Sequence, residues 1–284
     1  MRCGSINYSQ PGVITMRGIL LVAVAASIST SAFAADQTCA ALIAALPKLS
    51  GSTPLAASGT GQTYKQLYDQ CDAANKFAGQ ALPKHNGRPL KCSTDKNRVA
   101  FLSRYPDGTI AFQAKAGVDA DGSKLACGTG WPNQCGTWLT FDQGSERKDV
   151  NAEDTPFVVV PTDMPRTGIS FQRDSGVKRG DLAVIVAKGR CVFGVVGDAG
   201  PYFRLGEISL RAQSDLNNPQ CKVKDQYPCK AIIGGGGGVG IPSEVTYLIF
   251  PGTRPSPLWS QNVNSVGDSA GRKRVEKFLS DFVH

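Results

Sequence analysis

Short apolar runs, each ended by glycine, proline or aspartate, recur along the chain from residue 98 onward. Their strand-like length and their content of valine, isoleucine and aromatic side chains predict β-strands. We expect strands at residues 99–102, 109–113, 138–141, 157–160, 182–187, 192–196 and 245–250. Residues 98–284 are therefore predicted to form one mainly β domain, in which residues 182–196 make a hairpin that turns at residues 188–190.

One stretch of this β region carries two acidic residues in contrasting positions. The apolar run 192–196 is followed by the turn-forming residues 197–201, so Asp198 is expected at the end of a strand. Alternation resumes at residues 204–211, with Ile208 on one face and Glu207 and Ser209 on the other. If Ile208 faces the core, Glu207 faces away from it.

Helical periodicity marks both ends of the β region. Residues 36–46 are alanine-rich and residues 64–74 repeat apolar side chains at helical spacing, so residues 35–97 are predicted to form an N-terminal, mostly helical segment. The Gly, Ser, Thr and Pro residues at 50–63 are expected to link the two helices. At the other end, a C-terminal amphipathic helix is predicted from the spacing of Val275, Phe278, Leu279 and Phe282.

Residues 1–34 have the features of a secretory signal peptide. Arg17 precedes an apolar run at residues 18–26, and the sequence Ala32-Phe33-Ala34 matches the small-x-small cleavage pattern, so the mature chain would begin at Ala35. The apolar run is short for a spanning helix, which makes a membrane anchor the minor alternative. We expect a secreted protein, extracellular or periplasmic, with no membrane association after cleavage.

Export changes what the cysteines imply. Removal of the signal leaves eight, an even number that in an exported chain predicts up to four disulfides. The nearest local pairs are Cys127 with Cys135 and Cys221 with Cys229, while Cys39 and Cys71 are candidates for tying the N-terminal helices to the barrel. Because the chain has no Cys-x-x-Cys and only two histidines, His85 and His284, we expect no metal and no cofactor.

Charge limits the class of partner. The formal charge is +8, and loss of Arg2 and Arg17 with the signal leaves 29 basic and 23 acidic residues, or +6. No Arg-rich helix or base-stacking pattern accompanies this charge, so we expect no nucleic-acid partner. We also expect the protein to be a monomer. A positive protein opposes binding of a polycation, so such a ligand would need a locally acidic groove.

Asp198 and Glu207 are candidates for acid and base catalysis. A straight strand would spread these nine positions over about 30 Å, whereas two carboxyl groups that serve one sugar bond lie roughly 5 to 9.5 Å apart. The chain must reverse between them, and Gly200-Pro201 supplies a turn. The alternative is an Asp that caps a turn and a Glu on a solvated face, an arrangement common in proteins.

Several segments between residues 105 and 253 occur in an order found in a known family. They are the runs 180–201 and 206–209, Phe157-Val-Val-Val-Pro161, Val245-Thr-Tyr-Leu-Ile-Phe-Pro-Gly252 and Val118-Asp-Ala-Asp-Gly122. Together they resemble the fungal-type chitosanases of glycoside hydrolase family 75. The resemblance implies hydrolysis of the β-1,4 bonds of chitosan with inversion by one Asp and one Glu, roles that would fall on Asp198 and Glu207. The cysteine content and the five glycines at residues 234–238 depart from that family's pattern.

A weaker similarity links the chain to double-psi β-barrel proteins, including expansin-like proteins and wall-lytic transglycosylases. It implies a compact six-stranded, double-psi-like barrel with an open groove and flanking N- and C-terminal helices. Two alternatives to a chitosanase follow, a peptidoglycan-directed lytic enzyme and a non-catalytic, expansin-like protein that binds wall polysaccharide.

Other residues are secondary candidates for binding sugar. Asp119 and Asp121 could bind hydroxyl groups or assist the base, although Asp119-Ala-Asp121-Gly122 also matches half of a calcium loop or a plain turn. Aromatic rings stack on sugar faces, and Tyr202 is the first candidate because it directly follows the turn after Asp198. The tryptophans Trp131, Trp138 and Trp259 are further candidates.

Overall fold

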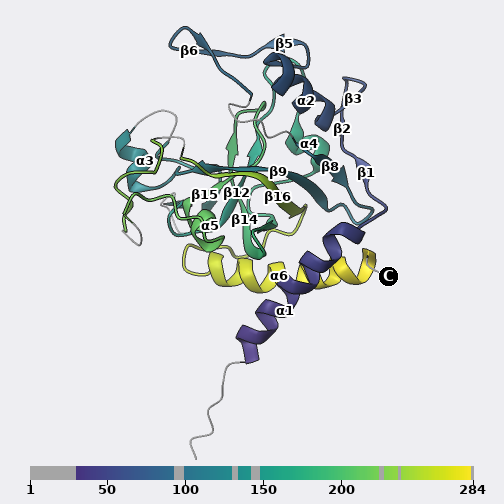
Figure 1. Cartoon of the computed structure of the whole chain (residues 1–284), viewed down its shortest axis with the longest axis vertical. Coiled ribbons are helices and arrows are strands. Elements are labelled where there is room, and N and C mark those ends of the chain that lie inside the picture. Colours follow the sequence, from purple (N-terminus) through teal and green to yellow (C-terminus); the bar gives the residue numbers. More distant parts are fainter. Residues whose placement is uncertain are drawn as a thin grey trace, which may run out of the picture.

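The computed structural model describes residues 30–92, 99–129, 134–141, 148–223, 227–235 and 238–282, with side chains from residue 37 onward. Its centre is a closed six-stranded β-barrel flanked by helices (Figure 1). The strand order around the barrel is β9 (Ile110–Asp119), β15 (Glu207–Ser209), β12 (Phe157–Pro161), β14 (Arg190–Gly200), β13 (Leu182–Ala187) and β16 (Ile241–Phe250), which pairs back to β9. The prediction of a mainly β, six-stranded barrel with flanking helices is confirmed.

The strands bury both of their faces, which explains their nearly unbroken apolar runs. One set of alternating side chains fills the barrel and continues under the N-terminal helix α2 (Tyr64–Ala74), and includes Val158, Val196, Ile208 and Tyr247. The other set lies on the outer wall against α1 (Thr30–Ala45) and α6 (Val263–Phe282), and includes Phe157, Val159, Val195 and Phe250. Figure 1 shows α1 and α6 together on one side of the barrel, with α2 on the opposite side.

The C-terminal helix packs with the face that the sequence predicts. Val275 and Phe278 are fully buried, and Leu279 and Phe282 pack partly buried against the same outer core. The helix begins at Val263, earlier than its apolar repeat indicates. Gly271 brings the helix backbone close to Phe193 of β14, and the guanidinium of Arg272 lies 4.3 Å from the centre of that ring. This helix therefore holds β14 from outside the barrel.

The N-terminal segment contains both predicted helices but also short strands. Helix α2 starts with a capping box between Thr63 and Gln66. The expected linker at residues 50–63 instead contains β1 (Thr53–Pro54), which pairs with β8 (Phe101–Arg104), and the pair β2 (Ala56–Ala57) and β3 (Gln62–Thr63). The remaining short elements of this segment are η1 (Leu46–Lys48), β4 (Lys76–Phe77), β5 (Gln80–Ala81), β6 (Lys84–His85) and β7 (Arg88–Pro89).

Two local predictions around the acidic residues are wrong. Strand β14 does not end at Val196 but continues through Asp198 to Gly200, because the parallel neighbour β12 supplies hydrogen-bonding partners for the glycines. Residues 204–211 are not one strand: after Ser209 the chain enters α5 (Leu210–Asp215). The Ser209 hydroxyl caps that helix by accepting the N–H of Ala212, and Ser209 is fully buried.

The other elements lie around the rim of the barrel. The hairpin at residues 182–196 is confirmed, with β13 and β14 antiparallel and Lys188 in the left-handed region at its turn. Residues 120–123 form the turn expected after β9. The remaining short elements are α3 (Lys124–Thr129), α4 (Phe171–Ser175), β10 (Thr140–Phe141) and β11 (Lys148–Asp149).

Four disulfides join the eight cysteines that follow residue 34. They are Cys39–Cys191, Cys71–Cys92, Cys127–Cys135 and Cys221–Cys229. The two local pairs are as predicted, and Cys39 ties α1 to β14. Cys71 does not reach the barrel, contrary to expectation, because its partner Cys92 belongs to the same N-terminal segment.

Most of the predicted signal peptide, residues 1–29, lies outside the described residues, as does Trp131. Among the helices described, none combines the length and the apolar character needed to cross a membrane.

Candidate active site

Asp198 and Glu207 lie on the two strands that flank β12, one on each side of Val159. Val159 of β12 pairs with Asp198 of the parallel strand β14 and with Glu207 of the antiparallel strand β15. Paired residues on neighbouring strands project from the same face of a sheet, so both carboxyl groups extend from the outer wall beside Val159. Two interstrand spacings place their α-carbons roughly 9 to 10 Å apart. The predicted chain reversal between the two acids is confirmed.

A bulge in β14 determines which way Asp198 faces. Val158 pairs with Val196 and Val159 pairs with Asp198, so Gly197 is an extra residue in this strand. Without it, the register would place Asp198 on the opposite face, inside the barrel. A Cβ at position 197 would overlap the ring of Phe157, which explains the glycine.

The Glu207 side chain leans toward the strand that carries Asp198. A Cβ placed on Gly200 of β14 would lie 3.1 Å from Cγ1 of Val159 and 3.4 Å from Oε2 of Glu207, so the Glu207 carboxyl reaches over Val159 to Gly200. Gly200 follows Asp198 by two residues, roughly 6.6 Å along a strand. The Glu207 carboxyl therefore lies close to the segment of β14 that carries Asp198.

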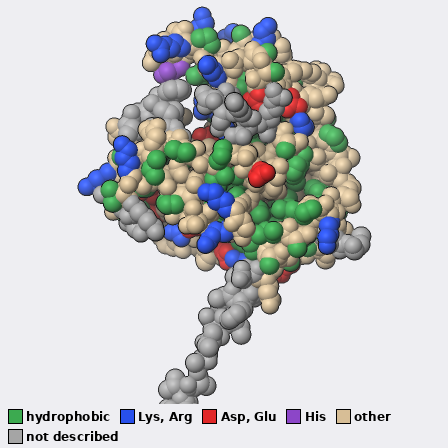
Figure 2. All heavy atoms as spheres, viewed as in Figure 1, with side chains coloured by type: hydrophobic (Ala, Val, Ile, Leu, Met, Phe, Trp, Pro, Cys, Tyr) green, Lys and Arg blue, Asp and Glu red, His purple; other side chains and the backbone are tan. Residues whose placement is uncertain are grey.

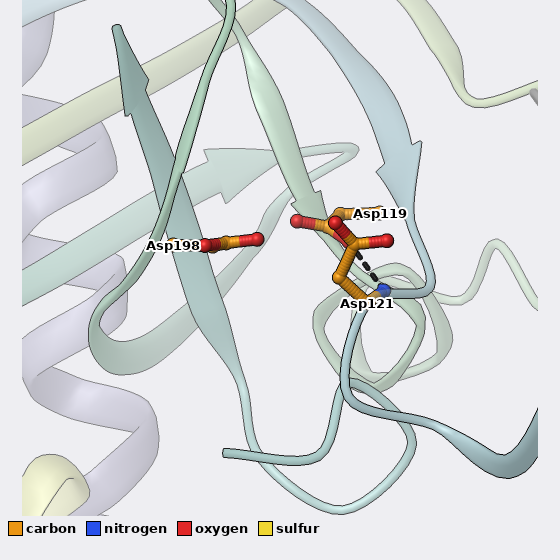
Figure 3. A group of neighbouring side chains, drawn as sticks. All are labelled: Asp119, Asp121 and Asp198. Carbon is orange, nitrogen blue, oxygen red and sulfur yellow. Dashed lines mark hydrogen bonds between the residues drawn. The ribbon is translucent and has the colours of Figure 1, made fainter. Parts of the chain in front are cut away.

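Asp119 and Asp121 join this site from β9. Strand β9 runs parallel to β15 and pairs Gly117 with Glu207 and Asp119 with Ser209, so Asp119 shares the face of Glu207. Asp121 follows in the turn after β9. Figure 3 shows the Asp198 side chain pointing from β14 toward the Asp119 and Asp121 carboxyl groups, and one oxygen of each lies within 4.8 Å of the others. The two secondary candidates are therefore part of the same cluster as Asp198.

Backbone N–H groups fix the orientation of all three aspartates. Asp198 Oδ1 accepts hydrogen bonds from the N–H of Trp138 at 2.7 Å and of Ala199 at 2.8 Å. Asp119 accepts the N–H of Asp121 at 2.6 Å, and Asp121 accepts the N–H of Gln134 at 2.6 Å. Such charge-assisted hydrogen bonds restrict the rotation of each carboxyl group and hold it toward its neighbours.

Burial keeps protons on this cluster up to near-neutral pH. Burial raises the pKa of Asp198 to about 6, although the N–H groups of Ala199 and Trp138 favour its ionised form. Burial also raises the pKa of Asp121 to about 7 and that of Asp119 well above its usual range, and the neighbouring carboxylates add to both effects. Near pH 6 to 7 the three groups therefore carry fewer than three charges, and a protonated neighbour can donate a hydrogen bond to Asp198.

Glu207 has a different electrostatic environment. The residue is half-buried, and burial raises its pKa, while nearby Arg204 and Lys115 act in the opposite direction. The negative charge of Asp198 adds to the increase. Glu207 is thus a carboxyl group that stays protonated to a higher pH than an exposed glutamate does.

Three oxygens from the aspartates could also contact a cation. Carboxylate oxygens are the ligands that Ca²⁺ and Mg²⁺ prefer, and Asp198 adds a third oxygen to the half loop formed by Asp119 and Asp121. Calcium takes about six to eight oxygens, and these aspartates already accept backbone N–H groups. The donor set suits a shared proton better than a complete calcium site.

The aromatic candidates lie in different surroundings. Tyr202, just beyond β14, is half-buried: its ring packs edge-on against Phe77 and Phe203, and its carbonyl accepts the Tyr68 hydroxyl. Trp138 lies directly against the site, because its N–H binds Asp198. Nothing in the sequence singled out Trp138 from the other aromatic residues, since its contact with Asp198 comes from tertiary structure.

Comparison with known proteins assigns no family to the chain. No protein-family model matches it, and a search of curated proteins found no match either.

Proposed function

We propose that the chain is a secreted glycoside hydrolase that cleaves the β-1,4 bonds of chitosan by inverting acid/base catalysis. The observation that carries this proposal is the placement of Asp198 and Glu207 on the same face, on the two strands that flank Val159. Inverting glycosidases hold their two carboxyl groups about 6.5 to 9.5 Å apart so that a water fits between base and sugar. The spacing of these strands is compatible with that range.

The surroundings of each acid suggest its role. Glu207, half-buried and with a raised pKa, donates a proton to the leaving oxygen. Asp198, held by two N–H groups and ionised above about pH 6, accepts a proton from a water as that water attacks the anomeric carbon. The bond from the anomeric carbon to the leaving oxygen breaks, and the new hydroxyl lies on the opposite face of the sugar.

The charge distribution supports a cationic substrate despite the net charge of +8. On the face drawn in Figure 2, Lys and Arg side chains are scattered among uncharged residues. In contrast, Asp119, Asp121, Asp198 and Glu207 gather on one part of the barrel wall. In this proposal the aspartates from β9 bind hydroxyl groups of the sugar or assist the base, and Tyr202 packs against a sugar ring at the rim.

Location outside the cytoplasm is part of the proposal. Four disulfides are typical of a protein that folds in an oxidising compartment, and the N-terminal pattern is that of a secretory signal. The proposed enzyme acts as a monomer and requires no cofactor.

The proposal is tested by replacing Glu207 with glutamine and assaying reducing ends released from chitosans of graded acetylation. Glu207→Gln removes the proton donor but keeps the shape of the side chain, so we expect at least about a 100-fold loss of rate with chitosan binding retained. Glu244→Gln, the same change at an exposed position on β16, is the matched control and should leave the rate unchanged. A Glu207→Gln variant with undiminished activity would remove Glu207 from the mechanism.

A further inference from the structure

A cationic hollow lies directly beside the acidic site. It has a volume of about 570 Å³ and is lined by Trp138, Lys178, Arg179, Asp181, Gly252 and Arg254. Three of these residues are cationic and one is acidic. Apart from Trp138, whose N–H holds Asp198, none of them takes part in the proposed acid/base chemistry.

Asp181 holds the backbone segments that form the hollow. Its side chain is almost completely buried and accepts the N–H of Lys178 at 2.7 Å and of Thr253 at 3.0 Å. These bonds tie together the two turns that carry Lys178, Arg179 and Arg254. The carboxylate oxygens of Asp181 are thus engaged by backbone N–H groups. The remaining charged side chains that line the hollow are all cationic.

Packing and hydrogen bonding position the two arginines. Gly180 has a φ of +85°, and a Cβ there would approach Cγ and Cδ of Arg254 to 2.9 Å, so the absence of a side chain at 180 leaves room for the Arg254 stem. Arg179 donates from Nη1 to the carbonyl of Trp138 at 3.4 Å. The hollow is therefore shaped by specific contacts as well as by charge.

The hollow lies next to Asp198, on the side away from Glu207. The N–H of Trp138 binds Asp198 while its carbonyl accepts Arg179, so one residue separates the acidic site from the hollow. In strand order, Glu207 is on β15, Asp198 is on β14, and Asp181 precedes β13, the next strand. A polymer that crosses from Glu207 to Asp198 would reach the hollow next.

We propose that this hollow is a subsite for a carboxylate carried by the sugar polymer, on the Asp198 side of the cleaved bond. The inference rests on the proposed hydrolase function and adds to its substrate class β-1,4-linked amino-sugar polymers in which some units bear a carboxyl group, such as a 3-O-lactyl ether. Arginine side chains match carboxylates through paired N–H donors, and lysine adds a further positive charge. Plain chitosan offers this subsite no anion.

The test measures binding apart from cleavage, by calorimetry on the Glu207→Gln variant. The probes are an amino-sugar hexamer in which alternate units carry a 3-O-lactyl group and the same hexamer with each lactyl carboxyl converted to the neutral amide. We expect the carboxylated hexamer to bind at least tenfold more tightly. Adding Arg179→Gln should abolish this preference, whereas adding Arg190→Gln, an equal change of charge at the exposed far turn of the hairpin, should preserve it.

Equal affinity for the two hexamers would overturn the subsite, as would a preference that survives Arg179→Gln. Free lactate binding as tightly as the carboxylated hexamer would also contradict a subsite that acts together with the sugar-binding residues. Failure of the parent enzyme to hydrolyse any amino-sugar polymer would contradict the proposed function instead. The two ideas can therefore fail separately.

Discussion

The Asp198 side chain is almost completely buried. In the proposed mechanism its acidic neighbour Asp121 acts in the protonated form. Asp121, with a pKa of about 7, keeps its proton at a pH where Asp198, with a pKa of about 6, has begun to ionise. The proton on Asp121 can then be donated to the Asp198 carboxylate, which favours its ionised form. In the proposed mechanism Asp121 therefore positions and tunes the base without touching the anomeric carbon.

This role predicts different pH profiles for two substitutions of Asp121. Because Asp198 must be ionised to act as a base, kcat/KM of the parent enzyme should fall below about pH 6. Asp121→Ala removes the hydrogen-bond donor, so the pKa of Asp198 should rise and the acidic limb should move upward by about one pH unit. Asp121→Asn retains an N–H donor and should leave the limb near its original position.

The measurement is kcat/KM on soluble amino-sugar oligomers between pH 4 and pH 8. Identical profiles for Asp121→Ala and the parent enzyme would show that Asp121 does not act on Asp198. A uniform loss at every pH in both variants would indicate a purely structural role.

At the scale of single elements, β14 carries the feature on which the site depends. Its bulge at Gly197 turns Asp198 to the outer wall, and the adjacent parallel strand β12 extends β14 beyond Val196. The sequence shows glycines after an apolar run, a pattern equally typical of a turn. Only the pairing with β12, a strand distant in sequence, distinguishes a bulge from a turn. The misplaced strand end at Val196 has this cause.

Gly197→Ala tests the bulge directly. The added methyl group would overlap the Phe157 ring, so we expect a loss of about 1–3 kcal/mol in the free energy of unfolding, together with reduced activity as Asp198 shifts. Gly128→Ala is the control, because a Cβ in that exposed part of α3 meets nothing within 4 Å. Urea unfolding and reducing-end assays on both variants measure the two effects. Unchanged stability and activity in Gly197→Ala would contradict the close packing at the bulge.

At the scale of the whole molecule, local sequence patterns predict the architecture well but predict few of the contacts around the site. Apolar runs and helical repeats indicate the barrel strands and α6, because burial of both sheet faces and of one helix face dictates those residues. The approach of Asp119 and Asp121 to Asp198 depends on closure of the barrel. The buried position of Ser209 likewise arises because α5 begins directly after it. Such contacts leave no periodic signal along the chain.

The central proposal is that Asp198 and Glu207 act on one glycosidic bond by a single displacement. Its most direct test is proton NMR of the first products released from a glucosamine hexamer, recorded before the new reducing ends mutarotate. Inversion at a β-1,4 bond predicts that the initial product is the α-anomer. Initial release of the β-anomer, or no cleavage of the hexamer, would contradict the proposal.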